Sequence, residues 1–165
     1  IKTMKKVQIV LLLLFTLVSM QMFAGKPNPA KYNNKIVSKQ HKVVDGFKAF
    51  FKTFEKGTKE KMHQERDALL ILVNASITDI KAMDGFDGDT QMRDGALALL
   101  NFYKSGLESD YHLMIELIAN RERSKEDHAK LEAFKDSLIA NEKIHDDMFE
   151  AIQIAFAKKY KLDLL

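Results

Sequence analysis

The sequence DTQMRDGALALLNFYKSGLESDYHLMIELI, residues 89–118, decides the fold class of the chain. Its apolar side chains recur every three or four positions over about eight helical turns, and no proline interrupts them. This spacing places them along one side of a helix, a stripe wide enough that it must be buried against other helices. The sequence therefore predicts an all-α protein. The stripe comprises Met92, Ala96, Leu99, Leu100, Tyr103, Leu107, Tyr111, Met114 and Ile118.

Three other stretches show the same helical period. They span residues 32–56, 59–83 and 125–159, and only short connections separate successive stretches. Because short connections favour antiparallel neighbours, we expect an up-down-up-down antiparallel four-helix bundle over residues 32–165, with its third helix at about 90–120. In the last helix the expected buried stripe comprises Leu131, Phe134, Leu138, Asn141, His145, Met148, Ile152 and Ala155.

The first 24 residues have the pattern of a secretory signal peptide. Lys5 and Lys6 precede an apolar run over residues 7–20, and Ala24 closes the segment. Residues 25–31 contain both prolines of the chain, so we expect a linker between the signal helix and the bundle. Two alternatives remain for the N-terminal segment, a retained membrane anchor and a buried core helix. Membrane association is expected only if the segment is retained.

The composition excludes several classes of site. The chain contains no cysteine, which rules out disulfides, thiolate-bound metals and a lipid-modified cysteine after the signal. Three of the 26 basic residues lie within the first 24 positions, so 23 remain to balance the 23 acidic residues, and the rest of the chain has no formal net charge. We therefore expect an exported protein, periplasmic or at the cell surface, that does not bind nucleic acid.

Polar residues at the helix boundaries are typical of N-caps. Thr58 and Ser124 each precede a helical stretch, and Ser124 stands in a capping-box spacing with Asp127. The turn DGFDGD, residues 84–89, is rich in aspartate and glycine, but its spacing does not match a calcium-binding EF-hand loop. We expect Phe86 to pack on the core and Asp89 to cap the next helix.

Four short runs carry a resemblance to a known family. They are Tyr32-Asn33-Asn34-Lys35-Ile36-Val37, the turn Phe86-Asp87-Gly88-Asp89 with Arg93-Asp94, Phe102-Tyr103-Lys104, and Phe156-Ala157-Lys158-Lys159. Together they resemble an uncharacterised family of exported bacterial surface or periplasmic helical proteins. Members of that family often carry a lipid-attachment cysteine, which this chain lacks. The resemblance implies an exported helical bundle and supplies no activity.

Two Glu-x-x-His pairs suggest a di-metal centre, because ferritin-like bundles use such a pair on each of two helices. The pairs are Glu60/His63 and Glu142/His145. In the expected topology their histidines lie roughly 20 Å apart along the bundle, whereas two metals at one site are about 4 Å apart. No nucleophile elbow or glycine-rich oxyanion loop is present either. We expect no metal, no cofactor and no catalytic residues.

Several polar residues interrupt the apolar stripes at one depth in the expected bundle. Gln40, Tyr103, Asn141 and His145 all lie near its middle, beside Asn74 or Ser76. A buried polar group without a partner costs about 1 to 3 kcal/mol, so we expect these groups to hydrogen-bond in one polar layer, with His145 at its centre. Such a layer sets the register of the helices.

The sequence as a whole predicts an exported, non-enzymatic binding or structural module of the bacterial cell envelope. The partner is unknown, and another envelope protein is one possibility. Two other functions remain open. One is a bundle metalloprotein of the ferritin-like type, and the other is an envelope module anchored in the membrane by its N-terminal segment.

Overall fold

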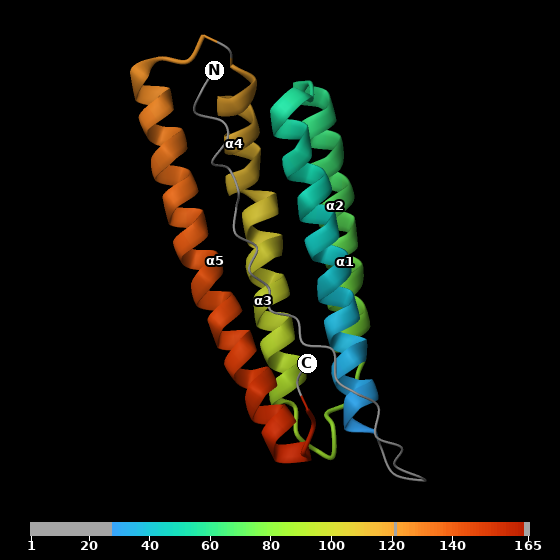
Figure 1. The fold of residues 1–165 in the computed structure, drawn as a ribbon. Coiled ribbons are helices and arrows are strands. Elements are labelled where there is room, and N and C mark those ends of the chain that lie inside the picture. Colours follow the sequence, from blue (N-terminus) through green and yellow to red (C-terminus); the bar gives the residue numbers. More distant parts are fainter. Residues whose placement is uncertain (1–27, 121, 164–165) are drawn as a thin grey trace.

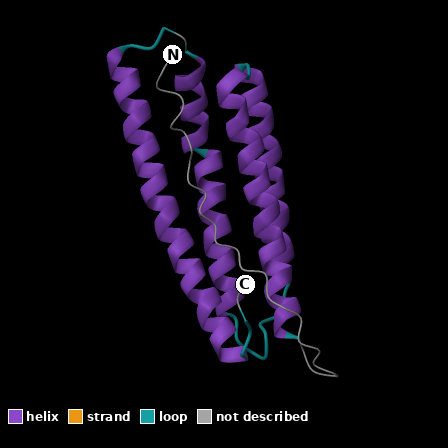
Figure 2. Ribbon diagram, viewed as in Figure 1, coloured by secondary structure: helices purple, strands orange, loops and turns teal. Residues whose placement is uncertain are grey.

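The structure, a computed structural model, describes residues 28–120 and 122–163. The described chain forms five α-helices and no strand, which confirms the all-α prediction (Figure 2). The expected signal peptide, residues 1–24, lies outside the described residues, as do residues 25–27 of the expected linker. No helix of the described chain is long and apolar enough to cross a membrane.

Helices α1 (Pro29–Lys56) and α2 (Lys59–Lys81) form a hairpin. The linker expected over residues 25–31 is too long, because its last three residues, 29–31, belong to α1. Pro29 is tolerated there since the first helical position needs no amide donor, and the Asn28 side chain accepts a hydrogen bond from the Lys31 amide at 3.0 Å. At the other end, Thr58 is the N-cap of α2, and its hydroxyl accepts from the Lys61 amide at 3.2 Å.

The turn between α2 and α3 is closed by two backbone hydrogen bonds between Phe86 and Asp89, of 2.8 and 2.9 Å. Asp87 and Gly88 take positive φ angles of 52° and 79° inside it, and Phe86 is buried. The N-cap of α3 is Thr90 and not Asp89, because the turn ends one residue later than expected. The Asp89 carboxylate nevertheless accepts from the Gln91 amide at 2.9 Å.

The single helix expected over 90–120 is two helices, α3 (Gln91–Glu108) and α4 (Asp110–Ala119). They follow one another end to end and separate at Ser109, where φ is −120° and ψ is −75° (Figure 1). The Ser109 hydroxyl donates to the Ser105 carbonyl at 2.8 Å, a side-chain bond that competes with the helical ladder. Gly106 leaves room for the Tyr111 ring of α4, since a Cβ atom at position 106 would lie 3.4 Å from that ring.

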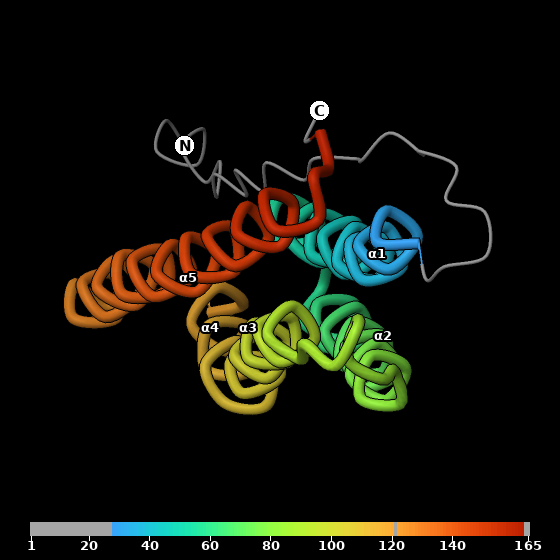
Figure 3. Tube along the Cα trace, turned by 90° about the horizontal axis from the view of Figure 1, so that it is seen from below, coloured from blue at the N-terminus to red at the C-terminus, as the bar shows by residue number. Residues whose placement is uncertain are grey.

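Helix α5 (Lys125–Tyr160) begins with a complete capping box, in which Ser124 and Asp127 bond each other's backbone amides at 3.0 and 3.2 Å. Its axis is inclined to the other helices. Its C-terminal end lies near α1, whereas its N-terminal end projects away from α1 and α2 (Figure 3). Most of its packing is therefore against α3 and α4.

Aromatic side chains in the core join α1, α3, α4 and α5. Phe47 of α1 lies edge-on to Tyr103 of α3 at 5.1 Å between ring centroids, and Phe50 of α1 contacts Tyr111 of α4 at 5.5 Å. At the opposite end, Tyr32 of α1 stacks on Phe156 of α5 at 5.8 Å. These contacts hold the helices in one bundle-like unit.

The buried face of α5 differs from the expected stripe by about one residue of helical rotation. It consists of Leu131, Leu138, Glu142, Phe149, Gln153, Phe156 and Ala157. Met148, expected in the core, is 55% exposed. Apolar residues surround most of this helix, so their period alone does not determine which side faces inward.

Candidate functional site

An acidic centre lies where α5 packs on α3. Glu142 and Asp146 stand one turn apart on α5, and the Tyr103 hydroxyl of α3 donates to an Asp146 carboxylate oxygen at 2.9 Å. Glu142 is only 8% exposed, and the structure gives its carboxyl no hydrogen bond among the described residues. A desolvated carboxyl without a donor is costly when ionised, so this is the electrostatically least satisfied part of the described core.

Burial shifts the proton equilibria of this centre. Desolvation, with a contribution from the Asp146 charge, raises the pKa of Glu142 to about 7. Desolvation also raises the pKa of Asp146 to about 6, although the hydrogen bond from Tyr103 acts in the opposite direction. The pKa values of Tyr103 and Tyr111 are raised well above the ordinary value by burial and by these carboxylates. The centre therefore changes charge near neutral pH.

Gln40 of α1 is another buried polar residue of the described core. It is 2% exposed, and within the described part of the chain neither its amide nitrogen nor its amide oxygen has a hydrogen-bond partner. Two turns nearer the start of α1, Asn33 accepts a hydrogen bond from Gln153 of α5 at 3.1 Å. Asp146 lies two turns before Gln153 on α5, just as Gln40 lies two turns after Asn33 on α1. Gln40 and Asp146 therefore lie on the same sides of their helices as the hydrogen-bonded pair. No hydrogen bond joins Gln40 and Asp146 among the described residues, and α5 is inclined to α1 (Figure 3).

The four residues of the expected polar layer are not joined. Gln40 and Tyr103 are buried, but Asn141 is exposed and donates to the Ser137 hydroxyl at 3.4 Å. His145 is half-buried and stacks on Phe102 at 4.2 Å between ring centroids. Among the described residues no hydrogen bond links any two of the four. Tyr103 instead donates to Asp146, a contact that the sequence pattern does not indicate because Asp146 lies outside the expected stripe.

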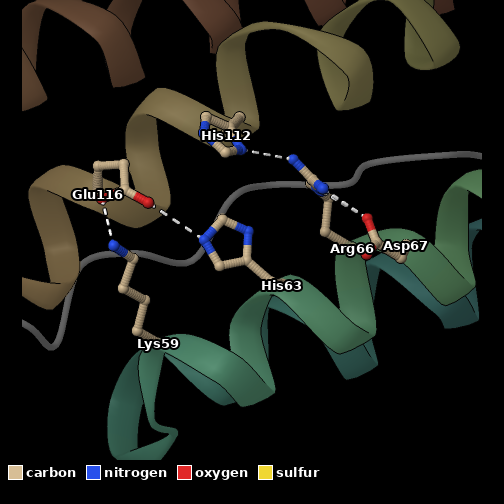
Figure 4. Close-up of polar contacts among 6 residues, drawn as sticks. All are labelled: Lys59, His63, Arg66, Asp67, His112 and Glu116. Atoms are coloured by element: carbon tan, nitrogen blue, oxygen red, sulfur yellow. Dashed lines mark hydrogen bonds and ion pairs between the residues drawn. The ribbon is translucent and has the colours of Figure 1, made fainter.

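A second polar cluster bridges α2 and α4 (Figure 4). His63 Nε2 lies 3.2 Å from one oxygen of Glu116, and Lys59 Nζ lies 2.6 Å from the other. The His63 and His112 rings are 5.0 Å apart, and Arg66 donates to His112 Nδ1 at 2.9 Å. Because arginine is always a donor, His112 presents an unprotonated Nδ1 to it.

Neither Glu-x-x-His pair forms part of a metal centre in the described residues. No group of three or more histidine and carboxylate side chains there is arranged to hold a metal ion. The Glu116 carboxylate is already paired with Lys59 and His63, and the hydrogen bond from Lys59 lowers its pKa. His145, the histidine of the second pair, is stacked on Phe102.

Between α3 and α5 lies a cavity of about 80 Å³, lined in part by Phe102, Gly106, Phe134, Leu138 and Asn141. Sites for organic ligands usually enclose about 300 to 1,000 Å³. This cavity has room for a few waters at most. It is therefore too small to be the site of an organic ligand.

The most unusual surface of the described chain is on α5. Six large hydrophobic side chains are exposed, and four of them, Ile139, Ile144, Met148 and Ile154, belong to this helix. The side of α5 opposite the core, here called the outer face, carries no charged residue along its centre between Ala133 and Ala155. Its residues are all exposed and comprise Ala133, Ser137, Ala140, Ile144, Met148, Ala151 and Ala155.

Comparison with known proteins adds no relative to this picture. No protein-family model matches the chain, and no curated protein or solved structure is significantly similar to it.

Proposed function

We propose that the chain is an exported, non-enzymatic module of the bacterial cell envelope that binds a partner protein through the outer face of α5. Its scaffold is an up-down-up-down four-helix bundle, in which α3 and α4 together take the place of the third helix. A signal peptide over residues 1–24 directs it to the periplasm or the cell surface. The outer face of α5 is the observation that supports binding.

Isolated apolar side chains are common on protein surfaces, but their concentration on one uncharged helix face is not. Ile144 is 56% exposed and Met148 is 55% exposed, and alanines continue the face in both directions along the helix. Covering such a face removes apolar surface from water at a gain of about 25 cal/mol per Å². A protein surface is therefore the occupant that fits it best.

The polar clusters support structural roles in this proposal. The acidic centre contains no nucleophile beside a base, and the cluster at His63 and His112 is occupied by its own ion pairs. Proton uptake by Glu142 changes the stability of the fold. No catalytic step is assigned to either cluster.

Export is tested by mass spectrometry of the chain recovered from the periplasmic and surface fractions of the producing cells. A mature N-terminus near residue 25 is the expected result. A chain that begins before Val7 and fractionates with membranes would instead favour the anchored envelope module.

Binding through α5 is tested with a photo-crosslinking amino acid placed at Ile144 or Met148 in living cells. The matched control carries it at Ile71, which is 71% exposed on α2. Discrete protein adducts at the two α5 positions, and none at position 71, are expected. Equal labelling at all three positions, or no adduct at any of them, would contradict the proposal.

A further inference from the structure

We infer that the outer face of α5 pairs with the same face of a second copy of the chain, with the two α5 helices antiparallel. This inference rests on the proposed function, which assigns protein binding to that face, and it names the partner. The shape of the face and the charges that border it both favour such a pair.

The outer face has the composition of a helix-pairing surface. Its two large side chains, Ile144 and Met148, stand near the middle, and small residues occupy positions on either side of them. Small residues allow two helix axes to approach closely, within the usual range of about 8 to 10 Å. No other described helix covers this side of α5 (Figure 3). A twofold axis near the middle therefore brings the large side chains of both copies together.

The charges beside the outer face are complementary to themselves in the antiparallel orientation. At about 100° per residue, Glu132, Asp136, Lys143, Asp147 and Glu150 border the same side of the face, and Lys158 lies at the edge of the face beyond Ala155. Lys143 precedes His145 by as many residues as Asp147 follows it, and the same holds for Glu132 and Lys158. With a twofold axis at the level of His145, Lys143 therefore lies opposite the partner's Asp147. Glu132 likewise lies opposite the partner's Lys158. In the antiparallel arrangement about His145, Asp136 and Glu150 lie opposite uncharged residues, Ile154 and Ala140.

The parallel orientation lacks these pairs. Its twofold axis runs along the helices and carries this border of one copy to the opposite side of the interface, so Lys143 does not face the partner's Asp147. Lys143 and Asp147 already form an exposed ion pair within α5 at 2.7 Å, with side chains 71% and 58% exposed. Both are free to extend to a second copy. Rim charges add little affinity, but they select orientation.

Cysteine cross-linking tests the arrangement directly, because the chain has no cysteine of its own. Ala140 and Ala151 stand on the outer face at nearly equal separations from His145, on opposite sides of it. Under mild oxidation, a mixture of Ala140→Cys and Ala151→Cys mature chains should form a mixed disulfide dimer, and each variant alone should form little. Cross-linking of each variant with itself, or yields no greater than those of an Ile71→Cys control, would overturn the inference.

Sedimentation velocity of the mature full chain gives an independent measurement. A concentration-dependent dimer is expected, with a dissociation constant on the order of micromolar because a single helix face is a small interface. Met148→Glu should raise that constant at least tenfold, whereas Ile71→Glu should leave it unchanged. Lys143→Asp should weaken the dimer, and adding Asp147→Lys should restore it.

The two proposals fail in distinguishable ways. A chain that stays monomeric at all concentrations, yet gives α5-dependent adducts with other envelope proteins in cells, would refute self-pairing and leave the proposed function intact. A monomeric chain without such adducts would refute both. Circular dichroism of each variant verifies that these exposed substitutions leave the helices folded.

Discussion

The side-chain nitrogen of Gln153 on α5 donates a hydrogen bond of 3.1 Å to the side-chain oxygen of Asn33 on α1, and both residues are buried. This pair joins the first and last helices of the chain where α5 lies close to α1. Replacing Gln153 by leucine leaves Asn33 without its donor and should lower the free energy of unfolding by about 1 to 3 kcal/mol. Adding Asn33→Leu should recover most of that loss. Urea denaturation of the three variants measures both effects, and an additive double variant would contradict the pairing.

Gln40 should behave in the opposite way. Its amide is buried and forms no hydrogen bond with any residue that the structure describes, so Gln40→Leu removes an unsatisfied polar group at nearly constant volume. We expect the free energy of unfolding to rise by about 1 kcal/mol, measured by urea denaturation. Gln40→Ala is the control, because it removes the amide but leaves a cavity and should not stabilise the protein. A destabilising leucine would show that the amide has a partner in solution.

The stability of the protein should fall as the pH rises toward neutrality. The pKa of Glu142 is raised from its ordinary value of 4.5 to about 7, so the folded chain binds the proton more tightly than the unfolded chain does. The resulting stabilisation is present in full below pH 4.5 and is lost as the pH approaches 7. Glu142→Gln should flatten this part of the profile and stabilise the protein above pH 7, by about 1 to 3 kcal/mol.

Thermal unfolding between pH 4 and pH 8 provides the measurement for Glu142. The exposed Glu132→Gln variant, matched in chemistry, should retain the slope of the parent chain. Part of the slope should persist in Glu142→Gln at lower pH, because the pKa of Asp146 is also raised, from 3.8 to about 6. Identical profiles for Glu142→Gln and the parent would place the titrating group elsewhere.

Asp89 ties the turn between α2 and α3 to the end of α5. Its carboxylate accepts from the Gln91 amide and pairs with Lys159 Nζ at 2.6 Å. Asp89→Ala should therefore lower the free energy of unfolding by about 1 kcal/mol, and by the same amount with calcium or with a chelator. Lys159→Ala should cost less, since it removes only an exposed ion pair. A loss that depends on calcium would identify the turn as a metal site.

Sequence periodicity predicts the helices well where one stripe is clearly apolar, as in α1 and α3. It does not predict the break at Ser109, because the stripe continues past a serine whose hydroxyl bonds the backbone locally. In α5, the expected stripe includes Met148 and Ala155, which are exposed, whereas the true buried face includes Glu142 and Gln153. The acidic centre depends on that rotation, so the sequence identifies Tyr103 and Gln40 but not the contact with Asp146.

The inclination of α5 gives the two halves of this helix unequal protection against opening. Its C-terminal half packs against α1, α3 and the aromatic residues around Phe156. Its N-terminal half packs, among the described helices, against α3 and α4. Local opening needs less free energy where fewer neighbours must separate. Amide hydrogens near Leu131 should therefore exchange with solvent deuterons sooner than those near Gln153. The chain would then fray along α5 from the end that follows α4, while the hairpin of α1 and α2 stays closed.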